Sequence, residues 1–218
     1  MEIIPAILTN SPDELKEKIR KLTLYSREYI KRVQIDIVDP NFTHNKTVGV
    51  EALDGVDTDL LLDLQLMVEE PINWVEKCVR VGAERIIGHV EQMQDQEEFI
   101  STVMESGLEV GLGLDIHTPV GAVKGVLSDV NLVLLMSVEV GFGGQEFDAR
   151  VLTKISELAQ LRREKGLRFN ICIDGGVNEQ NISELSNLGV DEVALGKSLW
   201  TGEGVEEEIE KFVRVLGG

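Results

Sequence analysis

The chain has 218 residues, of which 39 are acidic and 21 are basic, so its formal net charge is −18. This acidic balance argues against nucleic acid or an anionic membrane as a partner, because their phosphates require Lys and Arg. Hydrophobic residues make up 43% of the chain, enough for one sizeable core. No apolar stretch approaches the ~20 residues of a membrane span. Cys78 and Cys172 lack a paired spacing, so we expect reduced thiols and a cytoplasmic protein.

Short β-branched runs alternate with segments of helical spacing along the whole chain. Each apolar run is bounded by polar or glycine-rich residues, which is typical of strands in an alternating β/α fold. We predict eight strands, at Glu2–Leu8, Val33–Ile37, Asp59–Met67, Arg85–Val90, Glu109–Leu114, Asn131–Ser137, Phe169–Ile173 and Glu192–Leu195.

Several helix starts are signalled locally. Ser11 is followed by a proline and then by Glu14, a pattern that predicts a capping box and a helix. The dipeptide Thr118-Pro119 has the same form and predicts a second helix start. Asp148 is placed to cap a long helix over Ala149–Lys165.

Eight strands alternating with helices form either a closed (β/α)8 barrel or an open doubly wound sheet. The first strand is not followed by Gly-x-Gly-x-x-Gly, so the dinucleotide fingerprint of the open sheet is missing. Glycine-rich breaks follow the sixth, seventh and eighth strands, where barrels commonly build phosphate sites. No linker or shift in composition divides the chain. We therefore predict a single (β/α)8 TIM barrel of the α/β class over residues 1–218.

The glycine-rich breaks predict a cradle for a phosphate group. Glycine lets the main chain come close to an anion, and a following helix N-terminus points N–H groups at it. An ammonium group in the last break would strengthen phosphate binding. The predicted phosphate- and substrate-binding residues of these loops are Gly141, Phe142, Gly143, Gly144, Gly175, Gly176, Gly196 and Lys197.

Two carboxylates follow strands from different parts of the predicted ring. Asp36 ends the second strand and Asp174 the seventh, and chemistry in such barrels takes place at these strand ends. Two carboxylates facing each other across a bound substrate could remove a proton from one face of a carbon and return one to the other. This arrangement suits epimerisation next to a carbonyl.

A larger set of segments occurs in order at the predicted strand ends. They are Ile4–Leu8, Asp36–Asp39, Phe42, Asn45, Leu66-Met67, His89–Glu91, Met136–Val138, Gly141–Gln145, Asp174–Gly176 and Gly196. Together they resemble the ribulose-phosphate 3-epimerase family over nearly the whole chain. The resemblance implies a ribulose-phosphate-binding barrel that interconverts D-ribulose 5-phosphate and D-xylulose 5-phosphate in pentose phosphate metabolism. It also implies proton transfer by Asp36 and Asp174, a substrate contact at Met67, and a homo-oligomer as one possible state.

The chain departs from this family where the metal would bind. In the family the two aspartates hold a divalent metal together with two histidines, but here Gln34 and Gln65 occupy the histidine positions. An amide oxygen is a poor ligand for zinc or iron, although it suits Mg²⁺ or Mn²⁺. The cofactor is thus either absent or a divalent metal, Mg or Mn rather than Zn or Fe, held by Asp36 and Asp174. We predict that Gln34 and Gln65 mainly supply hydrogen bonds to the site.

Without a cation, two close carboxylates repel and tend to share one proton, which still leaves an acid–base pair. We therefore take a sugar-phosphate epimerase as the leading hypothesis. Two alternatives stay open: an isomerase or lyase of another phosphorylated sugar, and a catalytically inactive barrel that only binds a phosphosugar. The roles of His44, His117 and Glu139 are undetermined by the sequence, although either histidine could replace a lost ligand.

Overall fold

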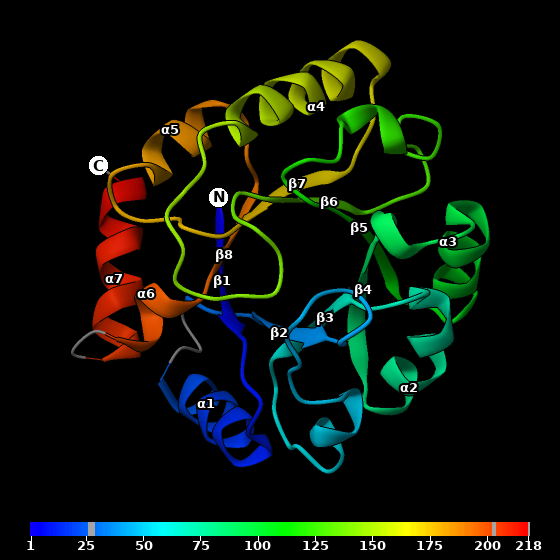
Figure 1. Ribbon diagram of the computed structural model, residues 1–218. Helices are drawn as coiled ribbons and strands as arrows, with labels where there is room; N and C mark the ends of the chain where they lie inside the picture. Colours follow the sequence, from blue (N-terminus) through cyan, green and yellow to red (C-terminus); the bar gives the residue numbers. More distant parts are fainter. Residues whose placement is uncertain (26–28, 202–203, 218) are drawn as a thin grey trace.

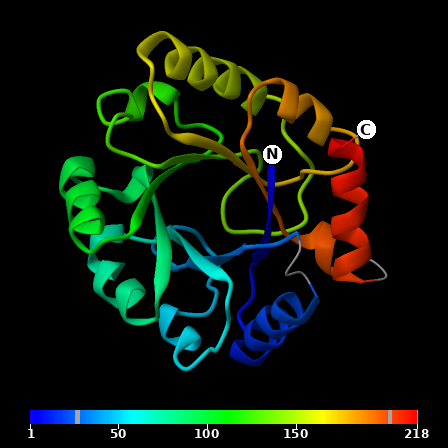
Figure 2. The ribbon, with the colours of Figure 1, turned by 180° about the vertical axis from the view of Figure 1, so that it is seen from behind.

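A computed structural model describes residues 1–25, 29–201 and 204–217 of the chain. Its eight strands are parallel and close into a barrel in chain order, with β8 hydrogen-bonded to β1. Figures 1 and 2 show helices arranged as an outer ring around these strands, seen from the two sides. The predicted (β/α)8 barrel is therefore confirmed.

The strands agree with the predicted runs to within two residues at each end. They are β1 Glu2–Ile7, β2 Arg32–Val38, β3 Leu61–Met67, β4 Ala83–His89, β5 Glu109–Leu114, β6 Leu132–Met136, β7 Asn170–Asp174 and β8 Glu192–Leu195. The α-helices are α1 Pro12–Tyr25, α2 Val75–Arg80, α3 Gln96–Glu105, α4 Val151–Lys165, α5 Ile182–Asn187, α6 Lys197–Trp200 and α7 Val205–Leu216. Four 3₁₀ turns complete the described elements: η1 Val50–Leu53, η2 Pro71–Trp74, η3 Val90–Gln92 and η4 Val120–Val123.

The cap of α1 forms as predicted on one side only. The Ser11 hydroxyl accepts the Glu14 N–H at 3.3 Å. The Glu14 carboxylate does not return to the Ser11 N–H, because it accepts the Thr9 hydroxyl at 2.5 Å and pairs with Lys18 at 2.7 Å. The capping box is thus half formed, and Glu14 is turned toward the barrel mouth.

Of the two other predicted helix starts, one is wrong and one is shifted by two residues. Thr118-Pro119 leads only into the four-residue turn η4, since Gly121 in that stretch disfavours a longer helix. The α4 helix begins at Val151 instead of Ala149, because the Asp148 N–H is bonded to the end of β6 and its carboxylate accepts the Arg150 N–H.

The barrel interior is polar at both ends and apolar between them. The apolar cluster inside the ring is formed by Ala6, Ile87, Leu132, Leu134, Met136, Val138, Cys172 and Ala194. Near the amino ends of the strands lies an ionic group, here called the lower layer: Arg32, Asp63, Arg85, Glu109, Asn170 and Glu192. Near the carboxyl ends lies the upper layer: Gln34, Asp36, Gln65, His89 and Asp174. Successive side chains of a strand alternate between interior and exterior, so residues two apart on β2 and β3 supply both layers.

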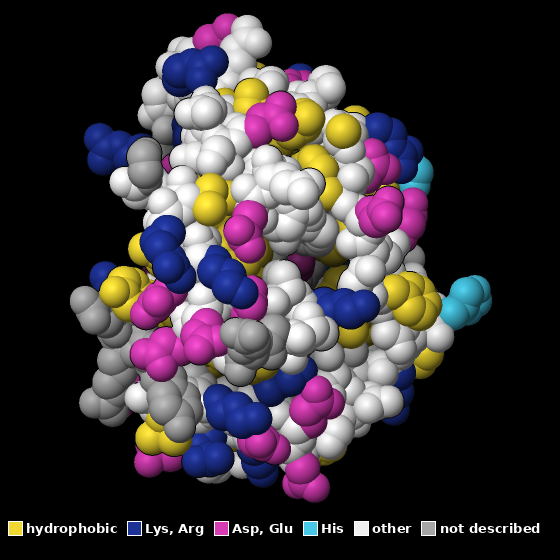
Figure 3. Space-filling model, turned by 90° about the vertical axis from the view of Figure 1, so that its left-hand side faces the viewer, with side chains coloured by type: hydrophobic (Ala, Val, Ile, Leu, Met, Phe, Trp, Pro, Cys, Tyr) yellow, Lys and Arg dark blue, Asp and Glu magenta, His cyan; other side chains and the backbone are white. Residues whose placement is uncertain are grey.

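The surface carries both signs of charge. On the face drawn in Figure 3, Lys and Arg side chains lie among Asp and Glu side chains. Within the three described ranges, no helix has the length and apolar character that crossing a membrane requires.

Candidate active site

A cavity of about 830 Å³ opens at the carboxyl ends of the strands. Asp36, Asp174 and Met67 line it, together with every residue of the predicted phosphate loops. Gln34 and Gln65 are absent from the lining; Gln34 is bonded to both aspartates, and Gln65 contacts Gln34. The strand-end residues that the sequence singled out therefore surround one cavity.

Asp36 and Asp174 are brought together by a single amide group. Gln34 Nε2 donates to Asp36 Oδ1 at 2.9 Å and to Asp174 Oδ2 at 2.9 Å. Burial and the neighbouring Asp174 raise the pKa of Asp36 well above its ordinary value, although the bond from Gln34 lowers it. Burial likewise raises the pKa of Asp174, to about 6, against the bond from Gln34 and the nearby His89. The pair is therefore suited to hold a shared proton near neutral pH.

Gln65 adds a second amide to this pair. Its Oε1 lies 2.6 Å from Gln34 Nε2, and its Nε2 lies 3.0 Å from His89 Nε2. The end of this amide that faces the aspartates lies 2.9 Å from Asp174 Oδ2 and 3.0 Å from Asp36 Oδ1. An amide oxygen at these distances requires a proton on one of the two carboxyl groups, whereas an amide nitrogen there would donate to both.

The phosphate loops are packed so closely that glycine is required. Gly144 has a φ of +79°, and a Cβ at this position would lie 2.6 Å from Lys197 Cδ and 3.0 Å from its Nζ. Lys197 therefore crosses directly over the β6 loop. A Cβ at Gly176 would lie 2.4 Å from the Phe147 backbone nitrogen. At both positions the neighbouring atoms leave no room for a side chain on the main chain of the loop.

Some residues of the cavity wall escaped the sequence analysis. Glu14 and Lys18 line the cavity from α1, and Trp200 lines it from α6. The Lys18 ammonium lies 4.8 Å from the centre of a Trp200 ring. Glu14 and Lys18 are four residues apart on a helix, which is typical of an ordinary exposed pair, so the sequence alone gave no signal for them.

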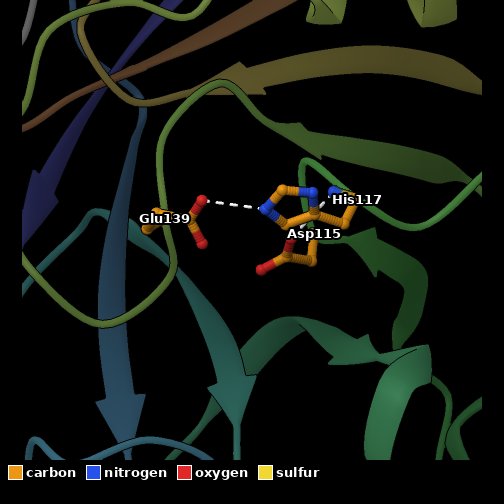
Figure 4. Close-up of side chains that lie close together, drawn as sticks. All are labelled: Asp115, His117 and Glu139. Carbon is orange, nitrogen blue, oxygen red and sulfur yellow. Dashed lines mark hydrogen bonds and ion pairs between the residues drawn. The ribbon is translucent and has the colours of Figure 1, made fainter.

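His44, His117 and Glu139 lie apart from the aspartates. None of them lines the cavity, and His44 is exposed. His117 Nε2 bonds Glu139 Oε1 at 2.9 Å, and one ligand atom each from Asp115, His117 and Glu139 lie within 4.8 Å of one another (Figure 4). The partners of His117 are thus Asp115 and Glu139, and neither aspartate of the upper layer is among them.

The comparisons with known proteins agree with this geometry. The model of the ribulose-phosphate 3 epimerase family matches residues 2–200. The ribulose-phosphate 3-epimerase of Bacillus subtilis is 34% identical over 204 residues, covering 92% of each chain. The chloroplastic ribulose-5-phosphate-3-epimerase of Arabidopsis thaliana is 33% identical over 213 residues, covering 95% of this chain and 74% of the relative.

Some solved structures are similar to this chain in fold, although their sequences are only 15–16% identical to it. A tryptophan synthase alpha-subunit from Pyrococcus furiosus has a TM-score of 0.69 at 16% identity and covers 100% of this chain and 98% of its own. A structure titled native KDPGal has a TM-score of 0.65 at 15% identity, with coverage of 100% and 95%. These likenesses show the (β/α)8 barrel fold, on which many different chemistries occur.

Among the many families that share this fold, the sequence relatives identify one. The chain belongs to the ribulose-phosphate 3-epimerase family. Its relatives are isomerases of the epimerase type, and the chain is accordingly a sugar-phosphate epimerase by family.

The family generally uses a divalent metal. In this chain the side chains of the upper layer are the candidate ligands for one. Gln34 Nε2 lies between three oxygens, on Asp36, Asp174 and Gln65, at 2.6–2.9 Å. This atom is an N–H donor, which cannot coordinate a cation, and neither glutamine supplies an imidazole nitrogen. The residues as they are arranged do not fit a zinc- or iron-type site.

Proposed function

We propose that the protein interconverts D-ribulose 5-phosphate and D-xylulose 5-phosphate by proton transfer between Asp36 and Asp174, without a catalytic metal. The observation that carries this proposal is the single Gln34 amide nitrogen lying 2.9 Å from both carboxylates. An amide donor is thereby the bridge between the two acid–base groups. The family membership supports the substrate class.

The proposed reaction begins with one aspartate ionised and the other protonated. The ionised carboxylate removes the proton at C3, and the electron pair of that C–H bond passes into an enediolate. The protonated carboxyl group then delivers its proton to C3 from the opposite face. The raised pKa values of Asp36 and Asp174 favour this singly protonated pair.

The two glutamine amides support either distribution of the proton. Gln34 Nε2 is equally close to both carboxylates and can donate to whichever one is ionised. The facing end of Gln65 is 2.9 and 3.0 Å from the same two groups. As an oxygen, it accepts from whichever carboxyl group is protonated. Such symmetry suits an epimerase, since the forward and reverse reactions exchange the roles of the two aspartates.

The phosphate group would bind along the glycine-rich loops that line the cavity. Its anionic oxygens would meet the main chain of the Gly141–Gly144 and Gly175-Gly176 segments, with the Lys197 ammonium beside them. This anchoring would fix the sugar so that C3 lies between the carboxylates, which is where positional precision has its largest effect on rate. The buried thiols of Cys78 and Cys172 are in keeping with the cytoplasmic setting that we propose.

Proton exchange tests the proposed function directly. The purified protein is incubated with ribulose 5-phosphate in deuterated water, and loss of the C3 proton signal is followed by NMR with and without a chelator. We expect the exchange to continue in the presence of the chelator.

The other outcomes of this experiment are equally decisive. Exchange that stops with the chelator and returns with Mg²⁺ or Mn²⁺ would contradict the metal-independent mechanism and indicate a hard cation on oxygen ligands. No exchange under any of these conditions would overturn the pentulose epimerase itself. Other phosphorylated sugars would then be tested in the same way.

A further inference from the structure

A chain of hydrogen-bonding side chains leads from the two aspartates, through buried His89, to Glu91 in the β4 loop. His89 is completely buried at the end of β4, and its Nε2 lies 3.0 Å from Gln65 Nε2. Its other ring nitrogen, Nδ1, lies 3.3 Å from Glu91 Oε2. Glu91, His89 and Gln65 thus connect the β4 loop to Asp36 and Asp174.

Neighbouring residues restrict the position of the His89 imidazole ring. Gly113 lies against it on β5, and a Cβ at that position would lie 2.7 Å from His89 Nε2 and Cδ2. The Phe42 ring meets the imidazole edge to face, with ring centres 5.5 Å apart. These two contacts fix the plane of the ring, so each nitrogen keeps its partner.

Glu91 is also fixed, because its two oxygens have different tasks. Oε1 accepts the Asp115 N–H at 2.7 Å, which leaves Oε2 to face His89. Burial raises the pKa of Glu91, but hydrogen bonds from His89, Thr118 and the Asp115 amide lower it to about 2. An ionised Glu91 can only accept, so the hydrogen of the neutral ring is held on Nδ1.

This tautomer determines the orientation of Gln65. With its hydrogen on Nδ1, the ring presents a lone pair at Nε2, which needs a donor from Gln65. The Met136 sulfur, 3.3 Å from Gln65 Nε2, is a weak acceptor and favours the same orientation. The amide oxygen of Gln65 then faces Asp36 and Asp174.

We propose that His89 and Glu91 are positioning residues that hold the Gln65 oxygen toward the two aspartates. This inference rests on the proposed function and deepens it. If Gln65 turned over, its nitrogen would donate to Asp174 Oδ2 at 2.9 Å and to Asp36 Oδ1 at 3.0 Å. Both carboxylates would be favoured in the ionised form, and the pair would lose its acid.

The substitution Glu91→Gln tests this chain of bonds. The Asp115 N–H still requires an oxygen, so the new amide nitrogen would face His89 Nδ1 and donate to it. The ring hydrogen would then move to Nε2, and Gln65 would turn its oxygen to the histidine. We expect kcat to fall on the order of tenfold or more, with KM within about twofold, as for a lost bond to a catalytic group.

The tautomer itself can be read without substrate. The chain has only three histidines, so ¹⁵N NMR of the imidazole nitrogens can be assigned by substitution. We expect the hydrogen of His89 on Nδ1 in the native protein and on Nε2 in Glu91→Gln. The matched control is Glu139→Gln, which alters the exposed His117–Glu139 pair and should leave kcat and the His89 signals unchanged.

A double substitution separates positioning from a general structural effect. In a Gln65→Leu background, Glu91→Gln should cause no further loss of kcat, because its effect passes through the amide. An equal loss in both backgrounds, or an Nε2 hydrogen in the native protein, would overturn the proposal. If the native protein fails to exchange the C3 proton, the proposed function is wrong, and the ring tautomers of the native and Glu91→Gln proteins still decide the positioning role.

Discussion

The barrel contains two polar layers that solve the same problem of burial in opposite ways. In the lower layer, Arg85 Nη2 lies 2.5 Å from Asp63 Oδ2 and 2.7 Å from Glu192 Oε2, so carboxylates are paired with a guanidinium. In the upper layer, the carboxylates of Asp36 and Asp174 meet the amide of Gln34. Charge is matched by charge in the first case and by a neutral dipole in the second.

The difference shows how one interior can be stable at one end and reactive at the other. Burial lowers the pKa of Arg85, but Asp63 and Glu192 raise it, so the guanidinium stays charged. Burial raises the pKa of Asp63 in this layer to about 6, although Arg85 and Arg32 lower it, so the charge pairing offsets burial only in part. The amides of the upper layer stabilise Asp36 and Asp174 too weakly to overcome burial, so the pKa values of both rise and a proton remains available.

The largest effect should follow removal of an acid–base group from the upper layer. Asp36→Asn or Asp174→Asn should lower the rate of conversion of ribulose 5-phosphate to xylulose 5-phosphate about 10³-fold, because each amide abolishes one of the two proton transfers. Conversion followed by NMR at saturating substrate checks this expectation. Asp129→Asn, on the surface away from the cavity, is the control. Retention of more than about a tenth of the rate by either variant would contradict the two-aspartate mechanism.

The next largest effect should come from the lower layer and should fall on stability. Arg85→Met leaves Asp63 and Glu192 buried with one partner fewer, so the free energy of unfolding should drop by about 3 kcal/mol. Chemical denaturation measures this change. The control is Arg80→Met, which breaks the exposed pair with Glu76 and should cost at most about 0.5 kcal/mol. Equal losses in the two variants would remove the distinction between the layers.

A smaller effect should appear in the pH dependence of stability. The folded-state pKa of Asp174 is raised to about 6, so the folded protein holds a proton that the unfolded chain releases near pH 4. Stability from this group is present below pH 4 and lost as the pH rises through about 6.

Asp174→Asn removes that loss. The free energy of unfolding of the variant minus that of the native protein should therefore be larger at pH 7 than at pH 4, by about 1–2 kcal/mol. Chemical denaturation at both pH values measures this difference. The titration of the buried Asp63 contributes equally to both proteins, so its contribution cancels. A constant difference across this range would show that Asp174 keeps its ordinary pKa.

The sequence determined much of this protein by local pattern alone. The eight strands were predictable because each is a short β-branched run with polar or glycine-rich ends, and closure followed from the position of the glycine breaks. The gathering of Asp36, Asp174 and the glycine-rich loops around one cavity was predictable because barrel chemistry lies at strand ends. The turn after Thr118-Pro119 was not, since the local start signal was outweighed by the glycine that follows it.

Only the tertiary structure decided how the upper layer works. Gln34, Gln65 and His89 come from three different strands, and nothing in their spacing shows which amide atom faces which carboxylate. The same is true of Glu91, whose two oxygens are assigned by the Asp115 amide and the His89 ring. The direction of a hydrogen bond depends on which donor meets which acceptor. Here these groups lie on different strands, so their pairing is decided only when the barrel folds.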